Sequence, residues 1–434
     1  MNRLVVRSED TYWMPEPPTA IGGVRTALTS YDLRVDQTAY TTLALLAGIR
    51  ADSSAKAPVL GGDDDASRRS LGLPSADAEP SVPAAELLTE RTAVRLLLDV
   101  ELLTGREIVD GPIEVRRSAR RNHNLSVRTT GGLGFLIKQA RIPESVATLR
   151  NEASVLNALA SCDGMTGNIP RLAHYNAPLA ALILELLPGQ PLRASLRQLR
   201  EWHMLRLGGA LAQAHTVQPG GLRQDHRVPL GIALHRPTLE LLRDASRANV
   251  QLLEAVHTDS YLCEHLASLE ASWQQSHFIH GDIKLDNVVA NDLGDTKELV
   301  IVDWEAASWG ERRWDVGCAI GEVMHAWVVE AVGRELGLPS LEPGGEGPSG
   351  LDYSRCLIDA LVEGYTASGD PPTAAFIMDC FGFAAARLVQ AAYEGLQLRH
   401  EMDLYAVKTV QLAANIAKDP ELVAERFADL RTTQ

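Results

Sequence analysis

The chain has 434 residues, 45% of them hydrophobic, so it is long enough for two or three domains with a substantial core. It carries 56 acidic against 41 basic residues, for a formal net charge of −15 at pH 7. Because nucleic-acid phosphates select basic surfaces, this balance argues against a nucleic-acid partner, whereas it suits a cationic one.

The five cysteines are scattered along the chain, and none forms a Cys-x-x-Cys pair. We therefore expect free thiols in a reducing compartment rather than a disulfide framework or a zinc site. The first ten residues lack an apolar signal core, and no apolar run reaches the length of a membrane span. These features predict a cytoplasmic protein with no membrane partner.

The first 110 residues are predicted to be an N-terminal extension whose composition changes twice along the chain. Residues 1–50 contain short candidate strands and a helix at 37–46 that Asp36 would cap. Residues 51–85 are rich in Ala, Ser, Asp, Gly and Pro, which is typical of a linker or a poorly ordered insertion. Apolar residues at helical spacing return over 84–103.

Two strands and a glycine-rich turn follow the extension. The polar segment 118–124 predicts a loop, and strands are expected at 125–128 and at 135–138, which ends in Lys138. The turn between these strands, 130–134, holds three glycines. A tight turn between strands requires glycine as much as a phosphate-binding loop does, so we assign no phosphate to this turn.

Apolar spacing predicts a helix over 145–159, which carries Glu152. An apolar strand at 179–187 ends in Pro188-Gly189, and a long helix over 193–216 comes next. Two further helices are expected within 237–275. This succession of a small sheet followed by helices favours an α+β fold.

One stretch concentrates the chemically capable side chains. Asp282 lies in a His-Gly-Asp turn, Asn287 follows five positions later, and an apolar strand ends at Asp303. A hairpin between 287–290 and 299–302 would bring Asp303 back beside Asn287. One carboxylate can orient a hydroxyl and take its proton, while a carboxylate and an amide oxygen offer hard ligands to Mg²⁺. The spacing therefore predicts metal-assisted phosphoryl transfer, and it fits an ordinary capped loop less well.

These motifs carry a resemblance to the aminoglycoside phosphotransferase family, which shares the protein-kinase-like fold. It rests on His280-Gly281-Asp282 with Asn287, on Asp303-Trp304-Glu305, and on Gly310-Glu311-Arg312-Arg313-Trp314-Asp315-Val316-Gly317. The resemblance spans about residues 110–430 and implies two lobes. A small antiparallel-sheet N-lobe with the hinge would occupy 111–190, and a helical C-lobe with the catalytic loop and acceptor site would occupy 191–434.

The resemblance implies ATP and Mg²⁺ as cofactors and gives each matched residue a role. Asp282 would be the acceptor base or orienter, and Asn287 and Asp303 would bind Mg²⁺. Asp315 would brace the catalytic loop. Lys284 stands where Ser/Thr protein kinases keep a lysine and many small-molecule kinases do not. It could follow the migrating γ-phosphoryl group, although a solvent-facing lysine is an equal alternative.

Nucleotide contacts follow from the same resemblance. Lys138, held by Glu152, would contact the α- and β-phosphates. The phosphates would lie under the polar loop 118–124, where Ser118 and Asn122 offer side chains and backbone N–H groups. Adenine would contact the backbone near two hinge residues, Glu185 and Leu187.

The acceptor is predicted only by class. The N-terminal region weakly resembles peptide-recognition domains of ribosomal peptide pathways, which bind a leader peptide as an added strand. Together with Lys284, it favours a Ser or Thr of a biosynthetic peptide, as for the kinase-like partners of thioamitide and class V lanthipeptide pathways. The alternatives are an aminoglycoside or a related small hydroxyl compound, a choline- or homoserine-type acceptor, and a nucleotide-binding pseudokinase scaffold. The alternative for the N-terminal region is a family-specific cap on the kinase lobe, and a choline- or homoserine-type kinase would predict that the region is dispensable.

The C-terminal region is predicted to be helical, at 319–336, 351–367, 372–397, 403–417 and 420–430. Helices at this position usually build the acceptor cleft in small-molecule kinases. Acidic residues there could receive amines, but we expect each to lie on the surface: Glu322, Glu394, Glu401 and Asp403. His215 is expected to be a packed residue at a helix end.

Overall fold

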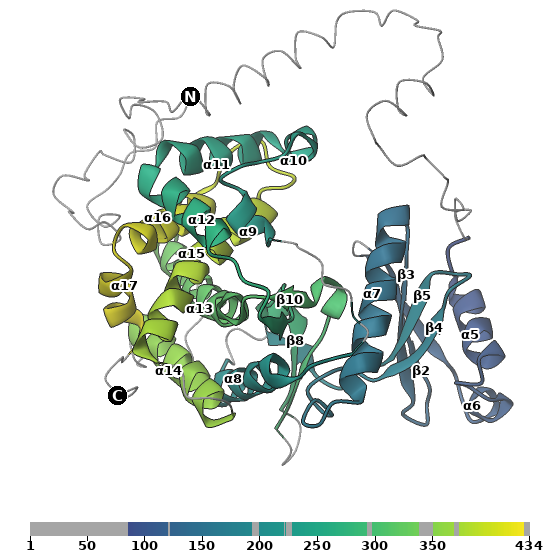
Figure 1. Ribbon diagram of the computed structural model, residues 1–434. Coiled ribbons are helices and arrows are strands. Elements are labelled where there is room, and N and C mark those ends of the chain that lie inside the picture. Colours follow the sequence, from purple (N-terminus) through teal and green to yellow (C-terminus); the bar gives the residue numbers. More distant parts are fainter. Residues whose placement is uncertain are drawn as a thin grey trace, which may run out of the picture.

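The computed structural model describes residues 86–119, 122–192, 199–220, 222, 228–292, 297–337, 350–368 and 373–428. These residues form a small lobe built on a sheet and a larger helical lobe (Figure 1), as expected for the kinase-like fold. The strands and helix expected in residues 1–50, the linker 51–85 and any leader-peptide site on them lie outside the described residues.

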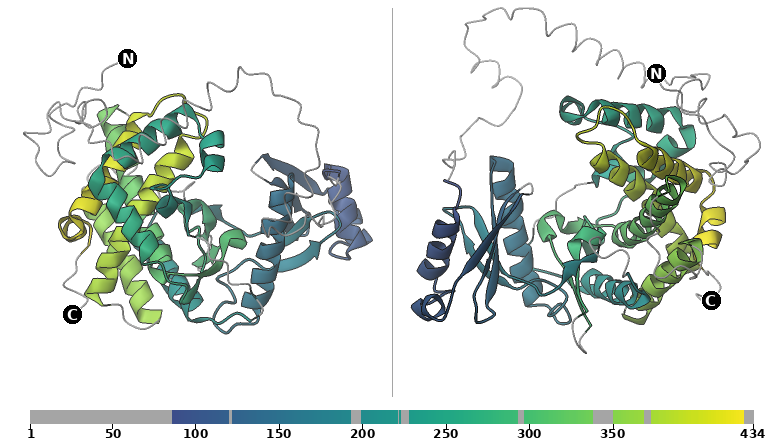
Figure 2. Two further views of the ribbon diagram at one scale, coloured as in Figure 1. Left: turned by 45° about the horizontal axis from the view of Figure 1, so that its top comes forward. Right: turned by 180° about the vertical axis from the view of Figure 1, so that it is seen from behind.

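The N-lobe is a five-stranded antiparallel sheet with helices on both faces (Figure 2). Its spatial order is β1-β2-β3-β5-β4. The strands are β1 (Glu114–Ala119), β2 (His123–Arg128), β3 (Gly134–Gln139), β4 (Leu172–Asn176) and β5 (Ala181–Glu185). The covering helices are α5 (Glu90–Asp99), α6 (Gly105–Val109) and α7 (Pro143–Ala160).

The apolar strand β5 is buried on both faces, which explains its continuous hydrophobic sequence. Ala181 and Ile183 pack with the residues of α5, whereas Leu182 and Leu184 belong to the core that includes α7. Successive side chains of a strand point to opposite faces, so an unbroken apolar run satisfies both cores.

Helix α5 shares the hydrophobic core of the N-lobe sheet, although its sequence falls in the predicted N-terminal extension. Ala93 and Leu97 are fully buried in the same cluster as Leu125 and Ile137. The backbone just before α5 is fixed as well, because the Leu88 N–H donates to Gln139 Oε1 at 2.8 Å. Residues from 86 onward therefore pack as part of this lobe.

Two local predictions in the N-lobe were wrong. The expected loop 118–124 is largely strand, since the register pairs Ser118 with Asn124 and only a short connection separates β1 from β2. Strand β4 was not predicted; all five of its residues are only partly buried at the edge of the sheet, so they lack an apolar pattern.

The C-lobe is built from ten described helices. They are α8 (Glu201–Thr216), α9 (Leu230–Ala233), α10 (Leu239–Asp244), α11 (Arg247–Thr258), α12 (Ser260–Ala271), α13 (Arg312–Glu335), α14 (Gly350–Ser368), α15 (Ala374–Gly395), α16 (Leu404–Lys418) and α17 (Pro420–Phe427). Three helices occupy 237–275 instead of the two expected. Helix α13 begins at Arg312 rather than 319, because the Glu311 side chain caps it by accepting the Arg313 N–H.

Helices α13 and α15 are long and apolar enough to meet the length and composition test for a membrane span, contrary to the sequence expectation. In both, 78% of the apolar window is buried inside the protein. The central helices of a helical core meet the same test for this reason.

Short strands position the central motif between the lobes. The pair β7 (His277–Ile279) and β10 (Ser308–Gly310) precedes and follows it, while β6 (Gln190–Pro191), β8 (Val288–Asn291) and β9 (Glu298–Ile301) form a second small sheet. The predicted hairpin is confirmed, with Val288 paired to Ile301. The 3₁₀ turns η3 (Leu285–Asn287) and η4 (Trp304–Ala306) complete the segment.

Candidate active site

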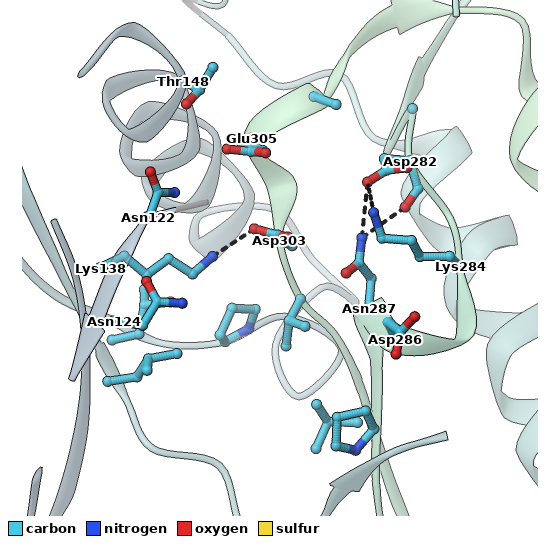
Figure 3. Close-up of a pocket in the computed structure, with 18 of the residues that line it drawn as sticks. Asn122, Asn124, Lys138, Thr148, Asp282, Lys284, Asp286, Asn287, Asp303 and Glu305 are labelled. Carbon is cyan, nitrogen blue, oxygen red and sulfur yellow. Dashed lines mark hydrogen bonds and ion pairs between the residues drawn. The ribbon is translucent and has the colours of Figure 1, made fainter. Parts of the chain in front are cut away.

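A cleft of about 1180 Å³ lies between the two lobes. The N-lobe wall carries Asn122, Asn124 and Lys138, and the C-lobe wall carries the catalytic loop and Asp303 (Figure 3). The structure thus gathers residues that lie more than 180 positions apart in the sequence.

Lys138 is held by two carboxylates. Its Nζ donates to Glu152 Oε1 at 2.8 Å, to Glu152 Oε2 at 3.0 Å, and to Asp303 Oδ1 at 2.8 Å. The predicted pairing of Lys138 with Glu152 is therefore present, and it is extended to Asp303. When Glu152 is ionised, one ammonium between two carboxylates leaves an excess negative charge, which a cation in the cleft can offset.

The burial of this cluster shifts the pKa values of its members. Burial raises the pKa of Glu152 to about 7, although Lys138 opposes the shift, and the charge on Asp303 adds to it. Burial alone would lower the pKa of Lys138, but the two carboxylates outweigh it and raise the pKa. Lys138 lowers the pKa of Asp303 against the effect of burial.

We expect the stability of the unliganded protein to depend on Glu152 between pH 5 and 8. In the folded protein Glu152 keeps a proton up to about pH 7, whereas in the unfolded chain it loses the proton near its ordinary pKa of 4.5. Its contribution is therefore present at low pH and lost as the pH rises through this window. Lys138 and Asp303 hold one charge state throughout.

Relative to Glu152→Gln, the free energy of unfolding of the wild type should fall by about 2–3 kcal/mol from pH 5 to 8, at about 1.36 kcal/mol per pKa unit. Urea unfolding of both proteins at several pH values measures this difference. A difference that stays flat over the window would contradict the shifted Glu152.

Asp303 and Asn287 present oxygen atoms suited to a hard cation. The Asn287 Nδ2 donates to the Asp282 carbonyl at 3.0 Å and to Asp282 Oδ2 at 3.3 Å, so the Asn287 Oδ1 is turned toward the cleft (Figure 3). No group of three or more His, Cys, Asp or Glu side chains gathers as a metal cluster in the described parts of the chain. Mg²⁺ fits such a sparse donor set, because it binds one or two carboxylates and completes its shell with phosphates and water.

The Asp282 carboxylate is oriented by its neighbours in the loop. Lys284 Nζ donates to Asp282 Oδ2 at 2.7 Å, and the Asp282 N–H donates to His280 Nδ1 at 3.2 Å. His280 Nε2 donates in turn to the Val302 carbonyl at 3.0 Å. Since Nδ1 accepts and Nε2 donates, His280 is the neutral Nε2–H tautomer, and it ties the Asp282 turn to the strand that leads to Asp303.

Asp315 braces this turn from helix α13, as the sequence predicted. Its Oδ2 accepts the His280 N–H at 2.7 Å, and its Oδ1 accepts the Gly281 N–H at 3.0 Å. His215 Nε2 contacts Asp315 Oδ2 at 3.2 Å, and His215 Nδ1 contacts the Tyr365 hydroxyl at 2.9 Å. His215 is thus a packed helix-end residue, as expected, and it supports the brace from behind.

Gly281 adopts a conformation that side chains rarely take. Its φ is +81°, and a Cβ there would lie 2.8 Å from the Ala306 carbonyl oxygen. Gly281→Ala should therefore lower the free energy of unfolding by about 1–3 kcal/mol and displace Asp282, because strain and a backbone clash act together. Gly132 has φ +91° with nothing within 4 Å, so Gly132→Ala is the control for the φ cost alone. Chemical denaturation that gives equal losses for both variants would contradict the clash.

Two asparagines line the N-lobe wall with unused acceptors. Asn122 and Asn124 are 7% and 8% exposed, and their Oδ1 atoms have no hydrogen-bond partner in the described structure. Asn124, which belonged to the predicted phosphate loop 118–124 but was not singled out as a site residue, pairs in register with Lys138. An unpaired buried amide is costly, so a ligand in the cleft is its natural partner. Ser118 lies in β1.

The hinge presents backbone groups to the cleft. The Glu185 N–H donates to the Arg171 carbonyl and the Leu186 N–H to the Gly134 carbonyl. Leu187 follows, and its N–H finds no acceptor among the residues that the structure describes. The Glu185 side chain turns outward to Arg171 at 2.7 Å. Both predicted hinge residues line the cleft.

Four polar residues of α13 and α15 lie in or beside the cleft, and the sequence analysis misplaced or did not name them. Glu322 was expected on the surface but is 1% exposed and pairs with Arg387, which was not predicted. Glu394 and Gln390 line the cleft wall and contact each other at 2.9 Å. The sequence signal that could have indicated the burial of Glu322 is its position within the most apolar part of the helix that follows Asp315.

Comparison with known proteins gives one family match. The model of the phosphotransferase enzyme family (APH) matches residues 113–341. No curated protein matches the chain.

Among solved structures, the chain is similar to a microcompartment-associated aminopropanol kinase at 16% identity, over 79% of this chain and 100% of that one, with a TM-score of 0.48. It is similar to an aminoglycoside phosphotransferase from Alicyclobacillus acidocaldarius at 16% identity, over 76% and 96%, with a TM-score of 0.43. A choline kinase from Cryptosporidium parvum is 12% identical over 77% and 96%, with a TM-score of 0.47.

Proposed function

Because the chain belongs to the phosphotransferase enzyme family, we propose that it transfers the γ-phosphoryl group of ATP to an acceptor hydroxyl with the help of Mg²⁺. The observation that carries this proposal is the meeting of two clusters across one cleft. Lys138, Glu152 and Asp303 form the first, while Asp282, Lys284 and Asn287 form the second. Phosphoryl transfer needs these parts: a cation for the nucleotide phosphates, hard oxygen ligands, and a carboxylate for the hydroxyl.

Asp282 acts on the acceptor. Its Oδ2 receives Lys284 and Asn287, so Oδ1 is available to a hydroxyl that enters the cleft. Oδ1 orients the hydroxyl toward the γ-phosphorus and receives its proton as the new P–O bond forms and the bond to the β-phosphate oxygen breaks, which releases ADP. The loop contacts of His280 and Asp315 fix this orientation before an acceptor arrives, which lowers the entropic cost of alignment.

The nucleotide phosphates are bound mainly by electrostatic attraction. Lys138 binds phosphate oxygens while Glu152 keeps it extended across the cleft. Asn287 and Asp303 would hold Mg²⁺, which would supply charge neutralisation to the transferring phosphoryl group. The backbone groups of the hinge near Glu185 and Leu187 form hydrogen bonds to the adenine ring. Asn122 and Asn124 line the N-lobe wall, and it is their amide N–H groups, not their oxygens, that can donate to the phosphates.

Lys284 supports the choice of a peptide acceptor. Burial lowers its pKa, but the Asp282 carboxylate outweighs this effect and raises it, so the ammonium remains charged beside the reacting hydroxyl. A lysine at this spacing is a feature that the loop shares with Ser/Thr protein kinases. We therefore favour the Ser or Thr hydroxyl of a biosynthetic peptide, with residues 1–85, the part of the N-terminal extension that precedes the N-lobe core, as the candidate leader-binding region.

A small hydroxylated amine is the second candidate. Glu394 lies on the cleft wall with its side chain 33% exposed, and Asp286 lines the same cleft. Carboxylates at this place can receive an amine of an acceptor, and the net charge of −15 would favour its approach.

The test is ATP consumption with Mg²⁺ across a panel of Ser/Thr-rich precursor peptides, aminoglycosides, choline and homoserine, with product masses measured. A peptide that gains one phosphoryl group, or loses water after it, supports the first candidate. A phosphorylated small molecule supports the second and leaves residues 1–85 without a recognition role. Nucleotide binding with no product from any acceptor or from water would contradict the proposed transfer.

A further inference from the structure

Helix α13 holds the catalytic loop at two points. Asp315 accepts the N–H groups of His280 and Gly281, and Glu322 Oε2 accepts the Leu285 N–H at 2.9 Å. Seven residues separate the two acids, which is about two helical turns or roughly 10.5 Å. Both carboxylates therefore lie on one face of α13, and each fixes one end of the loop.

Glu322 depends on Arg387 of helix α15. The Arg387 guanidinium donates to Glu322 Oε1 from Nε at 3.2 Å and from Nη2 at 2.9 Å. The side chains are 2% and 1% exposed, so water solvates neither charge. The two oxygens of Glu322 are thus divided, one for Arg387 and one for the Leu285 N–H.

Arg387 also reaches the cleft wall. Its Nη1 lies 3.4 Å from both Glu394 oxygens, and Gln390 donates to the same carboxylate at 2.9 Å. The closer contacts of Arg387 are those to Glu322. The guanidinium therefore makes its shortest hydrogen bonds to the residue that contacts the loop.

We propose that Arg387 is a positioning residue for phosphoryl transfer. It aims Glu322 at the Leu285 N–H and so fixes the turn Leu285–Asn287, whose last residue carries the metal-binding amide. The turn is also held by backbone hydrogen bonds from the Asn287 N–H to the Lys284 carbonyl at 2.8 Å and from the Val288 N–H to the Leu285 carbonyl, but Glu322 is the contact that ties it to helix α13. This inference rests on the proposed function for its kinetic consequence, while its effect on loop order is independent of that function.

A charge-neutral replacement separates positioning from simple stabilisation. Replacing a buried ion pair by uncharged residues of similar volume often leaves stability unchanged or improved. The double variant Glu322→Gln with Arg387→Met removes both charges, yet the glutamine oxygen can still accept the Leu285 N–H. Arg387→Met alone leaves a buried carboxylate without its partner, and the carboxylate must move or take a proton.

The experiment measures ADP release from Mg·ATP with water as acceptor, together with amide hydrogen exchange in peptides spanning 280–288. Arg387→Met should lower kcat about 100-fold with KM for ATP within about threefold, since a misplacement of about 1 Å costs about that much. It should also speed exchange at Leu285–Asn287. The double variant should return kcat to within about tenfold of wild type and restore protection.

Lys408→Met is the matched control. Lys408 is also a buried cation of the C-lobe, it contacts Glu335 at 3.8 Å, and it does not line the cleft. Its replacement should change stability without changing kcat per folded molecule or exchange in the loop.

Two results would overturn the inference. One is Arg387→Met with wild-type kcat and exchange at equal folded fraction. The other is a double variant as slow as Arg387→Met, which would mean that Arg387 does not act through Glu322. A wild type that transfers no phosphoryl group to water or to any acceptor of the panel refutes the proposed function instead, and the exchange pattern of the variants still decides the positioning role.

Discussion

Asp282→Asn is expected to lower kcat for phosphoryl transfer by about 10²–10⁴-fold, the usual contribution of a positioned acid or base. The asparagine keeps an oxygen that can accept from Lys284, so the loop should hold its shape. The lost negative charge removes the group that receives the hydroxyl proton. Isothermal titration with Mg·ATP should give a Kd within about threefold of wild type, because Lys138, Asn287 and Asp303 remain.

Asp292→Asn provides the control for this substitution. Asp292 follows in the same hairpin, contacts His203 at 3.3 Å and lies outside the cleft. The Asp292→Asn substitution removes the same charge as Asp282→Asn but at a position outside the cleft. We therefore expect an unchanged kcat. Full turnover in Asp282→Asn would remove Asp282 from the mechanism. A wild type that binds nucleotide yet transfers nothing would favour the pseudokinase scaffold.

The catalytic half of the site was predictable because its information is local. Asp282, Asn287 and Asp303 lie within 22 residues, and a hairpin between two short strands is enough to bring them together. The pairing of Lys138 with Glu152 was also predictable, since a strand end and the next helix face each other in this fold.

The remaining parts depend on packing that no local pattern reveals. A glutamate at position 322 has the same sequence appearance whether it faces water or Arg387, and only the contact of α13 with α15 decides. Asn124 became part of the cleft because β2 extends to His123 and pairs it with β3. The sequence reading placed a loop there, since polar residues at the end of a strand resemble a turn.

Asp303→Asn should separate metal binding from nucleotide binding. In the wild type, Asp303 Oδ1 takes one of the hydrogen bonds of Lys138 at 2.8 Å, and Glu152 takes two more. Phosphates must therefore compete with two carboxylates for one ammonium. Asp303→Asn removes one competitor and one repelling charge, so metal-free ATP should bind about tenfold more tightly, the equivalent of about 1.4 kcal/mol.

The same substitution should abolish the benefit of Mg²⁺. A neutral amide replaces the carboxylate that holds the cation and is a much weaker ligand for it, so kcat should fall about 10³-fold. Titrations with ATP in EDTA and in excess Mg²⁺ measure both effects, with Asp292→Asn again as the charge control. Weaker binding of metal-free ATP to Asp303→Asn would show that Asp303 does not restrain Lys138. The opposite signs expected for affinity and turnover follow from one cause. Asp303 would pair with Lys138 in the absence of metal and with the cation in its presence, so we expect the cleft to bind the metal–nucleotide complex in preference to the free nucleotide.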